Sequence, residues 1–95
     1  MQVDLFEWDD QKATINLKKH GVSFEEASTI FDDPYVLIES DGTSSFEELR
    51  AQATGFSARS RVLLVVYTER TERIRLISAR RASPDERRKY ESQFE

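Results

Sequence analysis

The sequence predicts an α+β fold in which helices pack on a mostly antiparallel sheet of four or five strands. Signals for the start and end of helices occur near the N-terminus and again near the C-terminus, and apolar stretches of strand length fill the segment between them. The turns that join the last strands are short, and strands joined in this way pair antiparallel. The expected order is therefore strand, helix, helix, four strands and a helix.

The N-terminal part predicts a short strand and a helical hairpin. The stretch VDLFEW alternates in polarity as a strand does, and Asp9 is suited to cap a helix over residues 10–20. Gly21 is the residue type that ends a helix in the left-handed conformation at least cost. Ser23 and Glu26 match a capping box, so a second helix is expected to start at once. Its expected apolar face consists of Phe24, Ala27, Ile30 and Phe31.

The later part of the chain predicts four strands and a C-terminal helix. YVLIE and LRAQATGFS are expected to be strands, with the polar loop SDGTSSFEE between them. RVLLVVYTE is the most apolar stretch and is therefore expected to be a central strand, paired with RIRLISAR. Ser83, Pro84 and Glu86 match a capping box with proline at the first helical position, which indicates the last helix.

Length and composition limit what the chain can be. Its 95 residues are expected to form one domain, residues 1–95. The absence of cysteine and the presence of one histidine exclude disulfides, a thiolate nucleophile and a Cys- or His-rich metal site within one chain. No apolar run is long enough to span a bilayer, and the N-terminus lacks the pattern of a signal peptide. We therefore expect a cytoplasmic protein with no membrane contact.

Charge is distributed unevenly along the chain. Residues 1–50 contain four Lys and Arg against twelve Asp and Glu, whereas residues 51–95 contain ten against six. The formal net charge is −4, so a basic second half is combined with an acidic first half. The basic half is suited to meet a polyanion, and the alternative is a solvated surface of mixed charge.

The basic side chains are the main candidates for chemistry. His20 falls in the last turn of the first helix, where the helix dipole favours its protonated form; it is either an acid or phosphate ligand, or a residue that merely caps or packs. Strict alternation places Arg75 and Arg80 on opposite faces of their strand, so they converge only if the strand twists, bulges or ends before residue 80. Glu48 and Arg50 share a strand face and form either a base with a phosphate clamp or a simple ion pair.

Such a set of residues is suited to cleavage of RNA. The chain contains no phosphate-binding loop, metal-binding helix motif or nucleophile elbow. What remains is a cofactor-free set of arginine, lysine, histidine and glutamate. In RNA cleavage the 2′-hydroxyl attacks the phosphate, cations stabilise the phosphorane, and an acid protonates the leaving oxygen.

Two long stretches carry a family resemblance. FEWDDQKATINLKKHGVSFEEASTIFDDP and LLVVYTERTERIRLISARRASPDERRKYE resemble the BrnT family of bacterial type II toxins, which is related to the RelE ribonuclease toxins. The resemblance implies a compact RelE-like fold and an endoribonuclease that arrests translation. It further implies a BrnA-like antitoxin with a ribbon-helix-helix segment, a toxin dimer within a heterotetramer, and operator DNA bound through the antitoxin.

The resemblance also implies roles for individual residues. His20 matches the histidine of the KHGVSFEEA motif, and Arg75 and Arg80 match the basic residues of the last strands; Lys19 and Arg61 are weaker matches. Leu49 stands where family members often have an acidic residue, which weakens the case for Glu48 and Arg50, and Ser60 stands where they commonly have glycine.

These observations lead to one hypothesis and two rivals. The leading hypothesis is a metal-independent endoribonuclease with candidate site residues His20, Arg75, Arg80, Lys19, Glu48, Arg50 and Arg61. The rivals are a non-catalytic scaffold that holds an antitoxin on operator DNA, and an inactive relative kept for partner binding.

Overall fold

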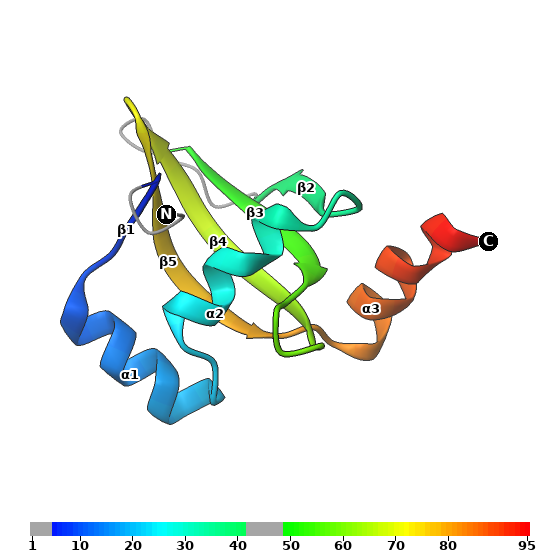
Figure 1. The fold of residues 1–95 in the computed structure, drawn as a ribbon, viewed down its shortest axis with the longest axis horizontal. Helices are drawn as coiled ribbons and strands as arrows, with labels where there is room; N and C mark the ends of the chain where they lie inside the picture. The colour runs from blue at the N-terminus through cyan, green and yellow to red at the C-terminus, as the bar shows by residue number, and fades with distance from the viewer. Residues whose placement is uncertain (1–4, 42–48) are drawn as a thin grey trace.

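The computed structural model describes residues 5–41 and 49–95 and shows five strands in one sheet, in the order β1-β5-β4-β3-β2 (Figure 1). β1 runs parallel to β5, and the other neighbouring strands are antiparallel. The strands are β1 (Phe6–Glu7), β2 (Leu37–Ser40), β3 (Arg50–Phe56), β4 (Val62–Arg70) and β5 (Arg73–Arg81). The predicted α+β class and order of elements are confirmed.

Each α-helix begins at its predicted capping residue, and the first also ends at the predicted glycine. They are α1 (Asp10–His20), α2 (Phe24–Ser28) with the 3₁₀ segment η2 (Thr29–Asp32), and α3 (Pro84–Glu91) with η3 (Ser92–Phe94). The Asp9 carboxylate accepts hydrogen bonds from the first-turn amides of α1, and Gly21 ends that helix at φ 71°. Ser83 and Glu86 form both arms of the predicted capping box at α3. None of the helices in the described residues is long and apolar enough to cross a membrane.

The capping box predicted for α2 is only half formed. The Ser23 hydroxyl accepts from the Glu26 amide at 3.0 Å, as expected. The Glu26 carboxylate does not reach back to the cap, because it is bound by the side chains of Ser57 and Arg61 instead. A long-range ion pair has therefore replaced the local cap.

Figure 1 shows α2 and η2 across one face of the sheet, here called the core face, and α1 beyond the edge of the sheet. It shows α3 at the end of the sheet opposite the turn between β4 and β5. The core face is formed on the central strands by Leu63, Val65, Tyr67, Leu76 and Ala79, all at most 4% exposed. The hairpin contributes Val22, Phe24, Ala27 and Ile30, each fully buried. Burial of these apolar side chains is the main favourable contribution to folding.

A β-bulge changes the facing of side chains along β5. Val66 pairs with Ser78 while Tyr67 pairs with Leu76, which leaves Ile77 as the extra residue. Because the bulge shifts the alternation by one residue, Arg75 and Arg80 lie on the same face, with Ser78 between them. We call this the outer face; its β4 residues are Leu64, Val66 and Thr68.

Gly55 allows η2 to approach the sheet closely. A Cβ at position 55 would lie 3.1 Å from Ile30 Cβ and 3.1 Å from Val36 Cγ2. We expect Gly55→Ala to lower the free energy of unfolding by about 1–3 kcal/mol through overpacking, measured by urea denaturation. Ile30→Val should not rescue it, because valine keeps the Cβ that clashes. A change below 0.5 kcal/mol would show that η2 can move away at little cost.

Candidate functional site

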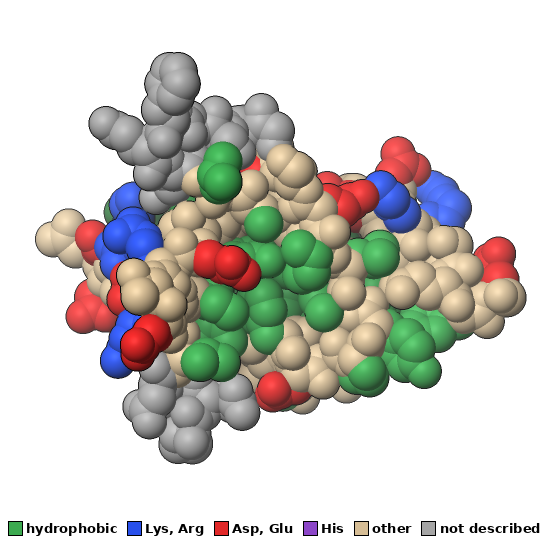
Figure 2. Space-filling view, turned by 90° about the horizontal axis from the view of Figure 1, so that it is seen from above, with side chains coloured by type: hydrophobic (Ala, Val, Ile, Leu, Met, Phe, Trp, Pro, Cys, Tyr) green, Lys and Arg blue, Asp and Glu red, His purple; other side chains and the backbone are tan. Residues whose placement is uncertain are grey.

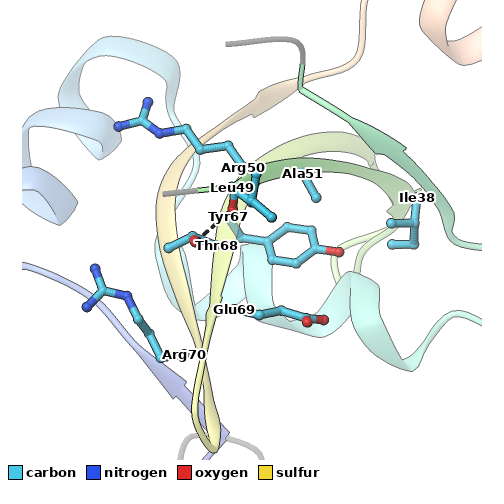
Figure 3. Close-up of a pocket in the computed structure, with 8 residues that line it drawn as sticks. All are labelled: Ile38, Leu49, Arg50, Ala51, Tyr67, Thr68, Glu69 and Arg70. Carbon is cyan, nitrogen blue, oxygen red and sulfur yellow. Dashed lines mark hydrogen bonds between the residues drawn. The ribbon is translucent and has the colours of Figure 1, made fainter. Parts of the chain in front are cut away.

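Arginines gather on the outer face because of strand register. Glu7 of β1, Arg75 of β5, Thr68 of β4 and Arg50 of β3 are successive partners and form one row across the sheet. Beyond this row, towards the β4–β5 turn, Arg70 pairs with Arg73. Figure 3 shows Arg50 and Arg70 pointing to one side of β3 and β4, with Tyr67 and Glu69 on the other. We define the arginine face as Arg50, Arg70, Arg73, Arg75 and Arg80.

The hollow drawn in Figure 3 lies where β3 begins and β4 ends. It has a volume of about 600 Å³ and is lined by side chains of both faces, with Ile38, Ala51 and Tyr67 forming its apolar part. Figure 2 shows a central area of hydrophobic side chains between charged groups at one end of the molecule and the C-terminal segment at the other.

Arg75 lies beside one acidic side chain and within electrostatic range of a second. Its Nη1 donates to Glu7 Oε2 at 3.1 Å, and both side chains are about one-third exposed. Asp9 is the second acid: the amides of Lys12 and Gln11 lower its pKa, and the charge of Arg75 adds to the effect. Arg75 is thus fixed beside a carboxylate and remains accessible to solvent, which is the arrangement required of a phosphate ligand with an adjacent base.

Arg80 is held by the start of α3. Its two terminal nitrogens donate to the two carboxylate oxygens of Glu86 at 2.8 and 2.9 Å, and Glu86 also accepts from the Ser83 amide at 2.8 Å. The Arg80 guanidinium lowers the pKa of Glu86 to about 2, and the Ser83 amide contributes further. The capping box thus fixes Arg80 as well as the helix.

This pair predicts a loss of stability in acid. Because the folded-state pKa of Glu86 is depressed, its contribution is complete above pH 4.5 and is lost as the pH falls toward 2. Since the Glu86 side chain is 29% exposed, we expect a discounted contribution of about 1–2 kcal/mol. Denaturation at pH 5 and pH 2.5 should show a smaller acid loss for Glu86→Gln than for wild type. Equal losses would contradict the assignment.

Arg61 forms a largely buried ion pair. Its Nε donates to Glu26 Oε2 at 2.9 Å, and its Nη2 donates to Glu26 Oε1 and, at 3.1 Å, to the carbonyl oxygen of Gly21. Glu26 also accepts from the Ser57 hydroxyl at 2.7 Å. The Arg61 guanidinium lowers the pKa of Glu26, whose side chain is 3% exposed. These contacts tie the turn after α1 to the start of β4.

His20 and Lys19 lie at the end of α1, beside β5. The buried Asn16 side chain fixes this position, because its amide donates to Ala79 O at 2.8 Å and its carbonyl accepts from Ala79 N at 3.1 Å. Beyond the end of β1, the Asn16 side chain thus makes the hydrogen bonds to β5 that a neighbouring strand would make. His20 is half-buried, and within the described residues its side chain has no hydrogen-bond partner.

The structure brings some of the predicted site residues together. Arg50, Arg75 and Arg80 share the outer face, whereas Arg61 is engaged at the turn after α1, and His20 and Lys19 lie at the sheet edge. Glu48 falls outside the described residues. Sequence reasoning missed Glu7, Asn16 and Glu86 as site neighbours; only the capping-box pattern placed one of them, Glu86.

The family is decided by comparison with known proteins. The sequence model described as "Ribonuclease toxin, BrnT, of type II toxin-antitoxin system" matches residues 8–86. The chain belongs to the BrnT family. This confirms the predicted family and makes the chain a ribonuclease toxin of a type II toxin–antitoxin system.

The fold is shared with a solved BrnT structure. The crystal structure of the Brucella abortus ribonuclease toxin BrnT, at 1.1 Å resolution, matches with a TM-score of 0.63 and 21% identity. The match covers 82% of this chain and 95% of the other. At this identity the likeness shows a common fold, not common site residues. No functionally curated protein matches the chain.

Proposed function

We propose that this BrnT-family chain is an endoribonuclease that cleaves RNA without a metal ion and thereby arrests translation. The observation that carries the proposal is the bulge at Ile77, which places Arg75 and Arg80 on one face of the sheet. A chain with net charge −4 thereby acquires a surface suited to a polyanion. Translation takes place in the cytoplasm, so this is where the proposed activity belongs.

Arg75 and Glu7 form the proposed reaction centre. The Glu7 carboxylate takes the proton from the RNA 2′-hydroxyl, and the hydroxyl oxygen attacks the neighbouring phosphorus. Arg75 stabilises the charge that develops on the phosphorane, and the P–O5′ bond breaks. The pair supplies the base and clamp that the sequence suggested for Glu48 and Arg50.

Arg80 is proposed to bind a second phosphate. The β4 partners of Arg80 and Arg75 are Leu64 and Thr68, four residues apart, which corresponds to about 13 Å along the strand. Two arginines at this spacing are suited to different phosphates of one strand rather than to the same one. The leaving oxygen is protonated by water. His20 and Lys19 stand at the far end of α1 from Glu7, about 15 Å along the helix, and are proposed to position the RNA.

The family implies protein partners as well. We propose neutralisation by a BrnA-like ribbon-helix-helix antitoxin, and a toxin dimer within a heterotetramer that binds operator DNA through the antitoxin. The acidic first half of the chain supports this arrangement, because it would disfavour direct contact between the toxin and DNA.

Expression without an antitoxin tests the proposal. Wild type should stop growth and fragment RNA, and the purified chain should cleave RNA with EDTA present. Arg80→Ala should weaken both effects, and Arg88→Ala, an exposed arginine paired with Asp85, should not. Intact RNA and normal growth with folded wild type would refute the proposal.

A second candidate is a non-catalytic scaffold. The observation that favours it is the pairing of both central arginines, Arg75 with Glu7 and Arg80 with Glu86. On this reading the pairs only stabilise the fold. It predicts that any growth effect is unchanged in His20→Ala and Arg80→Ala, while operator binding by the toxin–antitoxin complex still requires the chain.

A further inference from the structure

An aromatic pocket lies beside the arginine face, where the sheet meets the C-terminal helix. It has a volume of about 360 Å³, and its walls are formed by Phe56 and Val62 of the sheet and by Tyr90 and Phe94. Phe56 and Val62 are partners at the end of β3 and β4 and lie on the outer face. Figure 2 shows hydrophobic side chains reaching the surface beside the C-terminal segment.

Hydrogen bonds to one carboxylate hold the two walls together. Asp33 Oδ2 accepts from the Tyr90 hydroxyl and, at 2.9 Å, from the Phe56 amide. Burial and the neighbouring Asp33 carboxylate raise the pKa of Tyr90, which keeps its hydroxyl a donor. The Tyr90 and Phe94 rings meet edge to face, with centroids 5.6 Å apart. The pocket is thus formed before any ligand binds.

Two of its rings are about half exposed. Phe56 is 48% exposed and Phe94 is 55% exposed, although Tyr90 between them is 4% exposed. Large apolar rings that remain exposed around a fixed hollow indicate a surface that covers a ligand's apolar face.

We propose that this pocket binds an unpaired nucleobase of the RNA, by stacking on Phe56 and Phe94. The inference rests on the proposed function. Arg80 pairs with Leu64, and Phe56 pairs with Val62, two residues further along β4, or about 7 Å. A phosphate on Arg80 therefore lies within one nucleotide of the pocket. Stacking of unpaired bases on aromatic side chains is the usual way in which proteins bind single-stranded RNA.

Guanidinium groups near the pocket favour a ligand that carries phosphates over a purely apolar one. Arg87, paired with Glu91, stands on the rim, and Arg80, paired with Glu86, lies one row away. The acids at the rim already have partners: Glu91 accepts from Arg87 at 3.0 Å, and Asp33 is held by Tyr90 and two amides. The walls offer flat rings, and the rim offers guanidinium groups for the phosphates.

Binding of short RNAs tests this inference. The probe is a single-stranded RNA hexamer with 2′-O-methyl groups, which cannot be cleaved, and with one 2-aminopurine base. We expect Phe56→Leu and Phe94→Leu each to weaken binding by about tenfold and to reduce the quenching of 2-aminopurine. Phe56→Trp should bind at least as well as wild type. Leucine keeps the apolar volume, and the Phe56 amide keeps its bond to Asp33, so the fold is preserved.

Two controls separate this inference from the function on which it rests. Ile15→Ala removes an exposed apolar side chain of α1, 62% exposed, and should leave binding unchanged. Wild type should bind a hexamer with one abasic position more weakly than the intact hexamer. Phe56→Leu should bind the two hexamers equally well. A second possible result is RNA binding that depends on Arg75 and yet is unaffected by the Phe56 and Phe94 variants and by the abasic position. That result would refute the proposed base pocket and leave the proposed function standing. Loss of antitoxin binding alone in Phe56→Leu would show a protein-docking surface instead. Absence of any RNA binding would refute both proposals.

Discussion

Replacing Arg61 by alanine is expected to lower the free energy of unfolding by about 3–5 kcal/mol. This is the largest effect on stability expected for any substitution described above. The reason is the carboxylate that the change would leave behind. Glu26 is 3% exposed at its side chain and would keep only the Ser57 hydroxyl as a side-chain donor. Urea denaturation measures the effect, and Arg59→Ala, an exposed arginine of the same turn, should change stability by less than about 0.5 kcal/mol.

The pH dependence of the free energy of unfolding should have the opposite sign in Arg61→Ala and in wild type. In wild type the pKa of Glu26 is lowered by Arg61, so the pair's contribution is present above pH 4.5 and is lost as the pH falls through the depressed folded-state pKa. Without Arg61, burial raises the pKa of Glu26 above its unfolded value. The variant should therefore recover stability as the pH falls from 7 toward 5. A variant as stable as wild type at pH 7 would show that water replaces the guanidinium at little cost.

This pair also suggests what Arg61 contributes to the site. Its Nη2 binds the carbonyl oxygen of Gly21, the residue directly after His20. The Arg61 side chain is only 22% exposed and is bound to Glu26 and Gly21, so it is poorly placed to bind RNA as well. The Arg80 side chain, by contrast, is 41% exposed. We propose that Arg61 positions the end of α1, so Arg61→Lys, which keeps the charge, should still impair cleavage.

Local signals in the sequence predicted the elements well. Asp9, Gly21 and Ser83 act on the nearest turns of the chain, and the structure uses each as its chemistry predicts. Such contacts join residues two to four positions apart, so their partners are visible in the sequence itself. The bounds of α1, residues 10–20, follow directly from two of them.

The candidate site depends on contacts that have no local signature. Asn16 meets Ala79 across 63 residues, and Glu7 meets Arg75 across 68. Asn16 is buried, whereas Leu17, the next residue of the same helix, is 52% exposed. The free edge of β5 explains the buried amide: the backbone at Ala79 requires polar partners, and a side-chain amide offers a donor and an acceptor side by side.

The bulge in β5 could not be predicted from the sequence, which left open whether Arg75 and Arg80 share a face. Strict alternation separates Arg75 from Arg80, and nothing in ISAR indicates where an extra residue should fall. The register is set by the core instead, because Leu76 and Ala79 must both face the helical hairpin while Tyr67 and Val65 oppose them. Insertion of Ile77 satisfies both, and the shared facing of the arginines follows from it.

Replacing Arg75 by alanine is expected to reduce RNA cleavage by about 10²- to 10³-fold, because the phosphorane loses its adjacent cation. Stability should change little, since Arg75 and Glu7 are each about one-third exposed, and such pairs contribute about 0–1 kcal/mol. Single-turnover cleavage of a labelled RNA measures the effect, with thermal denaturation as the test of folding. Arg88→Ala, which removes an exposed i,i+3 pair on α3, is the matched control.

Glu7→Gln separates a catalytic pair from a structural one. As the proposed base, Glu7 should be required for proton transfer from the 2′-hydroxyl, so the glutamine variant should lose about 10²- to 10⁴-fold in rate. If the two residues act together on one phosphate, the double variant should be little slower than the slower single variant. If the rate loss of the double variant equals the product of the two single losses, the two residues act independently. A Glu7→Gln variant that cleaves at the wild-type rate would assign the base elsewhere and leave Arg75 as a ligand whose carboxylate partner only orients it.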